Sequence, residues 1–140
     1  IKVGVYWFSY STSPSDAYRE ANACLYCLNG KRLDMPVYYD LEYQPAMSMS
    51  NSNYTQMALN FCSTIKKAGY KSGVYSSASV YGYLLNRQTL INNGVSIWNA
   101  QWSSYCSVPC DIWQYSEKGQ VNGISASVDM NYIHNLNVVD

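Results

Sequence analysis

The stretch PVYYDLEY, residues 36–43, places two acids, Asp40 and Glu42, in an otherwise apolar and aromatic segment. Its valine, leucine and tyrosine content predicts a buried β-strand, which we place at residues 35–43. Side chains two residues apart in a strand point to the same side, so this strand would bring both carboxyl groups together. Burying an unpaired charge is costly, and no Lys or Arg adjoins either acid to neutralise it. The pair therefore indicates a functional site, the alternatives being acids on a surface loop or at a helix cap.

The segments on either side of this stretch alternate between strand and helix patterns. KVGVYWFSY, residues 2–10, predicts a strand, followed by a helix that starts after Ser13 or Ser15 and stops at Gly30. After residues 35–43, a polar loop through Asn51 and Asn53 leads to a helix at 54–68 and a strand at 72–76. A shorter helix is expected at 78–86, and then strands at 95–102, 111–116 and 128–132 with no helix between them. Successive strand–helix–strand units predict an α/β fold with a parallel sheet and helices outside it.

Composition limits the classes of partner. The 140 residues fit a single domain, residues 1–140, and have zero formal net charge with only 13% charged residues, so we expect no nucleic-acid partner. No apolar run approaches the roughly 20 residues that cross a bilayer, so we expect no membrane insertion. The 15 Tyr and 4 Trp combine flat apolar faces with polar groups, which suits a hydroxylated ligand such as a sugar.

Cysteine and histidine offer little for metal or triad chemistry. The odd set of five cysteines is most simply a set of structural thiols; the alternatives are a local Cys106–Cys110 disulfide and a zinc site joining that pair to Cys24 and Cys27. His134 is the only histidine, which argues against a Ser-His-Asp triad or a His-rich metal site. We expect no metal and no cofactor.

Two acids held close together have a specific chemical use. Each raises the pKa of the other, so one of them should stay protonated near neutral pH, at the carboxyl end of a parallel strand where α/β enzymes gather their chemistry. An acid beside a carboxylate is the pair that glycoside hydrolysis requires. A third acid, Asp129, lies in VDMN and could hold an active-site group, contact sugar or cap a turn.

The order and spacing of several motifs resemble the glycoside hydrolase family 25 muramidases, the Chalaropsis-type lysozymes. These motifs, which extend over nearly the whole chain, are KVGVYWFSY, PVYYDLEY, GVYSS, IWNAQW, IWQYS and VDMNYI. The resemblance implies a TIM-like (β/α)5β3 barrel that hydrolyses the β-1,4 bond between N-acetylmuramic acid and N-acetylglucosamine in peptidoglycan. It implies Glu42 as general acid, Asp40 as its partner and Asp129 as a late active-site acid. The residues matching the family's sugar groove are Tyr6, Phe8, Tyr75, Trp98, Trp102 and Gln114.

The chain departs from that family at its N-terminus. Family members have two further strands and a D-V-S motif with an active-site Asp, so this chain is expected to be an incomplete barrel of about six strands, starting at the third of eight. Open edges expose unpaired backbone groups, which an N-terminal segment, a second chain or self-association would have to cover. We expect weakened catalysis, and the alternatives are a catalytically impaired cell-wall glycan-binding module or a self-associating remnant of such an enzyme. The family implies a protein that is secreted, cell wall-associated or released by a phage at lysis.

Overall fold

Residues 1–139 are described by a computed structural model of the chain. Six strands form one sheet, in which spatial order follows chain order. The first five strands pair in parallel, and only the last pairing is antiparallel. The strands are β1 (Val5–Phe8), β2 (Val37–Asp40), β3 (Ser72–Ser77), β4 (Ser96–Ala100), β5 (Ile112–Gly119) and β6 (Val128–Ile133). The predicted α/β class with a mainly parallel sheet is confirmed.

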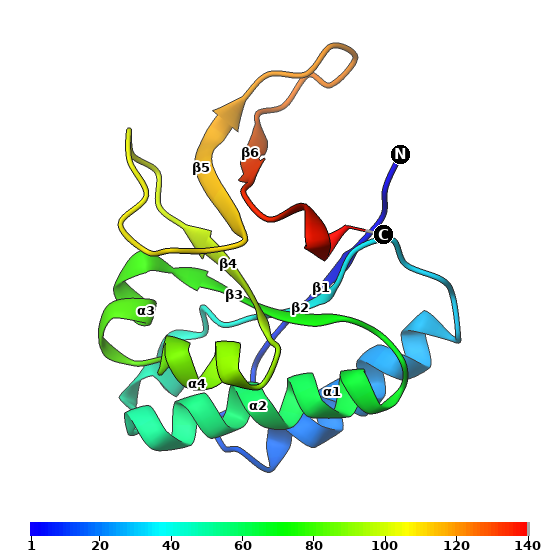
Figure 1. Ribbon diagram of the computed structural model, residues 1–140, viewed down its shortest axis with the longest axis vertical. Helices are drawn as coiled ribbons and strands as arrows, with labels where there is room; N and C mark the ends of the chain where they lie inside the picture. The colour runs from blue at the N-terminus through cyan, green and yellow to red at the C-terminus, as the bar shows by residue number, and fades with distance from the viewer. Residues whose placement is uncertain (140) are drawn as a thin grey trace.

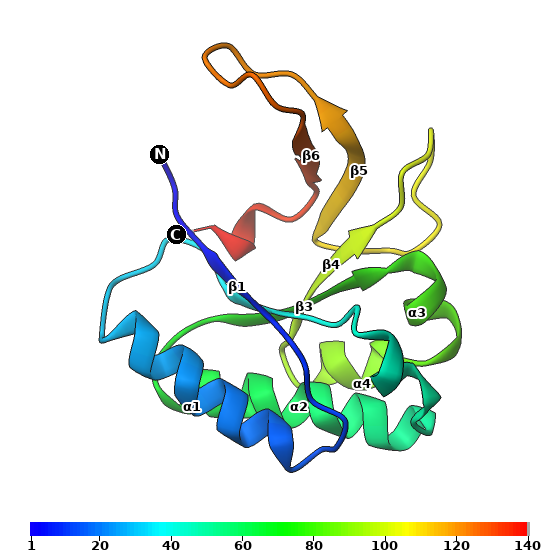
Figure 2. The ribbon, with the colours of Figure 1, turned by 180° about the vertical axis from the view of Figure 1, so that it is seen from behind.

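The helices are α1 (Asp16–Leu28), α2 (Asn51–Lys67), α3 (Ala78–Tyr83) and α4 (Arg87–Asn92), with 3-10 turns η1 (Gln44–Ser48) and η2 (Leu136–Val138). Figure 1 shows α1, α2 and α4 together against one side of the sheet, while β5 and β6 rise away from this helix layer. Figure 2 shows the same curled sheet from behind, with the side opposite the helices left open. The sheet is an incomplete barrel, as predicted. Within the described residues, no helix is long and apolar enough to cross a membrane.

The main core lies between the sheet and the helices. Tyr39 points outward from β2 and stacks on Phe61 of α2 with ring centroids 4.0 Å apart. The α1 face that meets this layer has its apolar residues at the predicted helical spacing, namely Ala17, Ala21, Cys24 and Leu28, all buried. Because Tyr38 and Asp40 alternate with Tyr39 along β2, their side chains point into the open side of the sheet. The fold thereby separates a helix-covered core from a concave face that carries polar groups.

Three predicted strands are shorter than expected, and one of them, the strand at 95–102, is β4, which ends at Ala100. The strand at residues 2–10 is reduced to β1, and the strand at 35–43 ends at Asp40. The Ser9 amide donates to the Asp40 carbonyl and the Leu41 amide to the Tyr75 carbonyl, after which the chain turns into η1. Pro45 fits the first turn of η1, where no amide hydrogen is needed. Strand alternation therefore does not extend to Glu42.

Two helix predictions also need correction. The helix expected at 54–68 begins earlier, because Ser50 accepts a hydrogen bond from the Asn53 amide and caps α2. The loop predicted through Asn51 and Asn53 is thus the first turn of a helix. The helix expected at 78–86 is α3, which ends at Tyr83. A further helix that was not predicted, α4, follows it, because the Asn86 side chain accepts from the Thr89 amide and caps a new helix.

Candidate active site

Asp40 and Glu42 line the same cavity at the carboxyl end of β2. Asp40 is the last residue of that strand, and Glu42 follows in the turn toward η1. The cavity has a volume of about 300 Å³, and its lining contains eight residues from all six strands and the segment after β2: Tyr6, Phe8, Asp40, Glu42, Tyr75, Trp98, Gln114 and Asp129. The sequence placed all eight at one site. The two acids share a side as expected, although the geometry that achieves this includes a turn as well as a strand.

Asp40 carries the strongest electrostatic perturbation of the site. Its side chain is buried, its Oδ1 has no hydrogen-bond partner, and no Lys or Arg lines the cavity. Burial, followed by the charge of Glu42 and a hydrogen bond with the Glu42 carboxyl group, raises the pKa of Asp40 to about 8. The Glu42 side chain, in contrast, is exposed. With its pKa raised, the buried Asp40 carboxyl group is the member of the pair that holds a proton near neutral pH. The sequence predicted one raised pKa in the pair.

Gln114 connects three other residues of the site. Its Oε1 accepts hydrogen bonds from the Tyr75 hydroxyl and from Trp102 Nε1, each at 3.0 Å. Its Nε2 then donates to Asp129 Oδ2 at 3.3 Å. Gln114 is only 3% exposed, so its amide is largely engaged within the protein. The two donors fix the orientation of the amide, which in turn holds the carboxylate of Asp129 at the cavity.

Aromatic rings form one wall of the cavity. The Trp98 ring meets Tyr75 and Tyr38 edge to face, with centroids 4.8 and 5.0 Å apart. Trp98 Nε1 donates to Asn131 Oδ1 at 2.8 Å, which fixes the indole plane. Asn131 was missed as a site residue by sequence reasoning. The available signal was its position in VDMN, two residues after Asp129 on the same face of β6.

Three other predicted aromatic residues lie at the edge of the site. Tyr6 and Phe8 line the cavity from β1 and are 65% and 36% exposed. Trp102 lies outside the lining of the cavity, is 56% exposed and reaches the site only through its hydrogen bond to Gln114. These exposed rings are available to a ligand, whereas Tyr75 is mostly covered.

Metal ligands do not converge at this site. Across residues 1–139, no group of three or more His, Cys, Asp or Glu side chains could hold a metal ion. His134 lies beside Trp113, with ring centroids 6.2 Å apart, rather than beside the acids. All five cysteines are free thiols, and the zinc alternative that joins Cys24 and Cys27 to the later pair has no geometric support.

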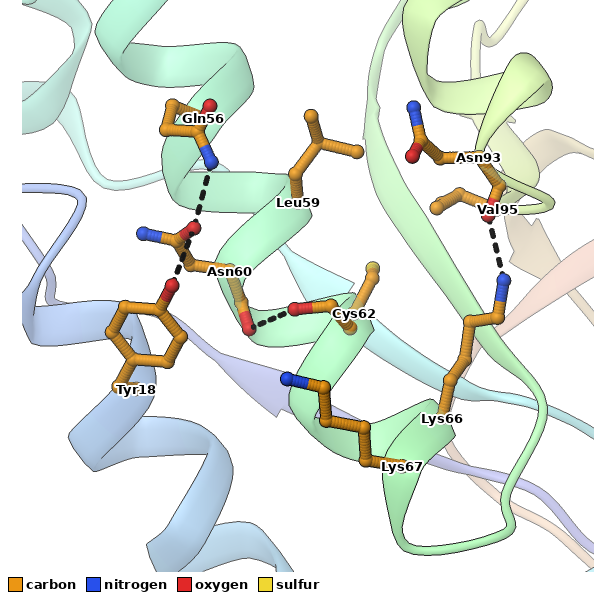
Figure 3. A pocket seen from close by; sticks show the side chains of 10 residues that line it. Tyr18, Gln56, Leu59, Asn60, Cys62, Lys66, Lys67, Asn93 and Val95 are labelled. Atoms are coloured by element: carbon orange, nitrogen blue, oxygen red, sulfur yellow. Dashed lines mark hydrogen bonds between the residues drawn. The ribbon is translucent and has the colours of Figure 1, made fainter.

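A larger cavity of about 670 Å³ lies on the helix side of the molecule, shown in Figure 3. Its lining includes Lys66, Lys67 and Asn60 but contains no carboxyl group. The Asn60 amide is already engaged, since Oδ1 accepts from Tyr18 and Gln56 and Nδ2 donates to the Pro14 carbonyl. We therefore place the active site at the smaller cavity, where acids and exposed aromatic rings meet.

Known structures have the same fold. The CTP1L endolysin is 30% identical to this chain, with a TM-score of 0.76. The match covers 93% of this chain and 46% of the endolysin chain. The catalytic domain of endolysin ply40, from bacteriophage P40 of Listeria monocytogenes, is 25% identical, with a TM-score of 0.69. This match covers 93% of this chain and 66% of the ply40 chain. The autolysin LytC of Streptococcus pneumoniae is 24% identical, with a TM-score of 0.79. This match covers 94% of this chain and 33% of the LytC chain.

The chain thus spans between a third and two thirds of the length of these structures. No curated protein sequence matches it. The sequence model of the glycosyl hydrolases family 25 matches residues 1–124, which include the acid pair and most of the cavity. On this match, which extends over most of its length, the chain belongs to glycosyl hydrolases family 25.

Proposed function

We propose that the chain hydrolyses the β-1,4 bond between N-acetylmuramic acid and N-acetylglucosamine in peptidoglycan. The observation that carries this proposal is the acid pair, Asp40 with a raised pKa and Glu42, in a cavity with exposed aromatic rings. Family membership and the likeness to the CTP1L endolysin support a cell-wall glycan as substrate. They also support action at a cell wall, by a protein that is secreted, wall-associated or released by a phage at lysis.

In this proposal Glu42 is the general acid, because it is the exposed member of the pair and can reach a bound glycan. The proton of Asp40 passes through the hydrogen-bonded Glu42 carboxyl group to the glycosidic oxygen as the bond from that oxygen to the sugar C1 breaks. Asp40 assists, either by orienting the substrate acetamido group as nucleophile or by activating water. Water finally adds hydroxide to C1 and returns a proton to the pair.

The remaining site residues are assigned to substrate binding and positioning. Tyr6, Phe8 and Trp98 offer ring faces to the C–H faces of sugars. Asp129, held by Gln114, contributes a carboxyl group to the cavity from β6. Trp102 contacts the glycan outside the cavity and Tyr75 supports the Gln114 amide.

The outer strands of the sheet need a partner in this proposal. β1 and β6 each have one neighbouring strand, and both contribute to a second cavity of about 300 Å³ whose lining is mainly apolar, including Val5, Met35 and Ile133. Unpaired backbone groups beside apolar surface favour association. An additional N-terminal segment, a second chain or a second copy would cover them, and without cover we expect weakened catalysis.

The second candidate function is a glycan-binding module without catalysis. The exposed rings of Tyr6 and Trp102 favour it, because they would hold a glycan whether or not the acids act. Clearing of a peptidoglycan suspension and co-sedimentation with peptidoglycan separate the two functions. Loss of turbidity supports the hydrolase, and co-sedimentation without clearing supports the binding module. If neither occurs, both proposals are wrong.

A further inference from the structure

Two cysteine side chains touch in the loop between β4 and β5. Cys106 Sγ and Cys110 Sγ are 3.6 Å apart, and both side chains are partly exposed. The other cysteines differ, because Cys24 and Cys62 are buried in helices, while Cys27 is exposed on α1. The Cys106–Cys110 contact plays no part in the chemistry proposed for the acids.

We propose that Cys106 and Cys110 form a site of oxidative modification, at which a peroxide converts the two thiols to a disulfide that closes the β4–β5 loop. A disulfide requires the sulfur atoms at about 2.0 Å, so they must approach by about 1.6 Å. Both residues lie in a segment without helix or strand, where side-chain rotation can supply this movement. This inference does not depend on the proposed glycan hydrolysis.

The reaction balances with a peroxide as the oxidant. The Cys106 sulfur attacks one peroxide oxygen, the O–O bond breaks, and a sulfenic acid and one water form. The Cys110 sulfur then attacks the Cys106 sulfur, the S–S bond forms, the S–O bond breaks and a second water leaves. The two thiols together lose two protons and two electrons, and hydrogen peroxide is reduced to two waters.

The surroundings assign different parts to the two thiols. Cys106 Sγ accepts a hydrogen bond from Asn99 Nδ2 at 3.4 Å, and its thiol donates to the Val108 carbonyl at 3.1 Å. Burial, followed by the contact with Cys106, raises the pKa of Cys110 to about 12. Cys106 is therefore the thiol that meets the oxidant, and Cys110 resolves the sulfenic acid from a position already in contact with it.

Closing the loop would act on a residue beside the candidate active site. The loop starts at Gln101, whose carbonyl accepts from Trp113 Nε1 at 2.8 Å, and continues through Trp102, whose indole donates to Gln114. The first end of the loop is thus tied to β5, and the cysteine pair extends from the middle of the loop to its other end. A disulfide there would reduce the motion of the loop and hold Trp102 beside the cavity.

Tryptic peptides allow a direct test on the purified chain. Cleavage after Arg87 and Lys118 releases residues 88–118, which contain Cys106 and Cys110 as their only cysteines. Cys24 with Cys27, and Cys62, fall in two other peptides. After mild hydrogen peroxide treatment and alkylation, we expect the 88–118 peptide to be lighter by about 2 Da than the unmodified reduced peptide, to carry no alkyl group, and to recover on reduction with dithiothreitol. The Cys24–Cys27 peptide should remain mostly alkylated.

Variants and a structural readout complete the test. In Cys110→Ser, Cys106 should stop at the sulfenic acid and react with dimedone, while Cys27→Ser as a matched control should leave the 88–118 disulfide unchanged. Chymotrypsin cleavage after the exposed Tyr105 should slow about threefold in the oxidised protein, and not in peroxide-treated Cys110→Ser. Two alkylated thiols in the 88–118 peptide of peroxide-treated wild-type protein, under conditions that oxidise Cys27, would overturn the proposal.

Discussion

The buried carboxyl group of Asp40 destabilises the fold as the pH rises. The pKa is 3.8 in the unfolded chain and about 8 in the folded protein, so the folded state binds more protons between these values. Stability associated with this group is therefore fully present below about pH 4 and is lost progressively as the pH rises to about 8. A buried acid with a raised pKa lowers stability near neutral pH, and we attribute its presence to the use of its proton in the proposed chemistry.

Replacement of Asp40 by Asn should remove this pH dependence. We expect Asp40→Asn to be more stable than wild type by on the order of 2 kcal/mol at pH 8 and to have nearly wild-type stability at pH 4. Urea denaturation at the two pH values measures the difference. The pKa values of Asp16 and Asp34 are lowered in both proteins, so the pH dependence that they cause cancels in the difference between wild type and variant. An equal stability difference at both pH values would show that Asp40 is not buried as an acid.

Gln114 should matter for stability as well as for the site. Gln114→Leu leaves the Tyr75 hydroxyl and the Trp102 indole without their acceptor and should lower the free energy of unfolding by about 2 kcal/mol. The exposed residue Gln88, on α4, is the matched control, and Gln88→Leu should change stability by less than about 0.5 kcal/mol. Urea denaturation followed by tryptophan fluorescence provides the measurement. Equal changes in the free energy of unfolding for the two variants would mean that the Gln114 hydrogen bonds do not contribute to stability.

At the scale of the elements, close packing between β2 and β3 shapes the aromatic wall. Tyr38 of β2 lies over Gly73 of β3, and a Cβ at Gly73 would overlap its ring. The ring is also held by Trp98 and by a 3.0 Å hydrogen bond with Ser96, so it has little freedom to move. The absence of a side chain at Gly73 is therefore what lets Tyr38 support the wall.

Alanine substitutions at two glycines test this packing. Gly73→Ala should destabilise the protein by about 3 kcal/mol, because the methyl group cannot be accommodated. Gly82→Ala is the control, since no atom lies within 4 Å of a Cβ there and alanine favours the helix α3, so that we expect a gain of about 0.5 kcal/mol. Thermal or urea denaturation of both variants decides the point. A stable Gly73→Ala protein would show that the Tyr38 ring can shift.

The sequence predicted the element order and the site better than the element boundaries. Alternating apolar patterns located all six strands, and the pairing of acids in PVYYDLEY located the cavity. The boundaries depend on side-chain caps, such as Ser50 and Asn86, that compete with several neighbouring polar residues in the sequence. The role of Gln114 could not be predicted, because its three partners come from β3, β6 and the β4–β5 loop and meet only in the folded chain.

At the scale of the whole molecule, the six strands leave the barrel open between β1 and β6. Apolar residues at this opening include Val5, Met35 and Ile133. Without a covering segment, such a surface favours pairing with a second copy of the chain. The open side is also the side that bears the acid pair, so whatever covers it would border the active site.

Self-association of the isolated chain is therefore expected. Sedimentation at increasing protein concentration should give a mass above the 15.8 kDa of one chain, and Ile133→Lys should shift the equilibrium back toward the monomer by placing a charge at the β6 edge. A mass of one chain over the whole concentration range would contradict association through these edges.

In the proposed mechanism, Glu42 delivers the proton that cleaves the glycan. The most direct test is the release of reducing ends from purified peptidoglycan by wild type, Glu42→Gln and Glu117→Gln, the last being an exposed acid on β5 outside the cavity. We predict new N-acetylmuramic acid reducing ends with wild type and Glu117→Gln, and a rate at least about 100-fold lower with Glu42→Gln. Release by Glu42→Gln at the wild-type rate would show that Glu42 is not the general acid.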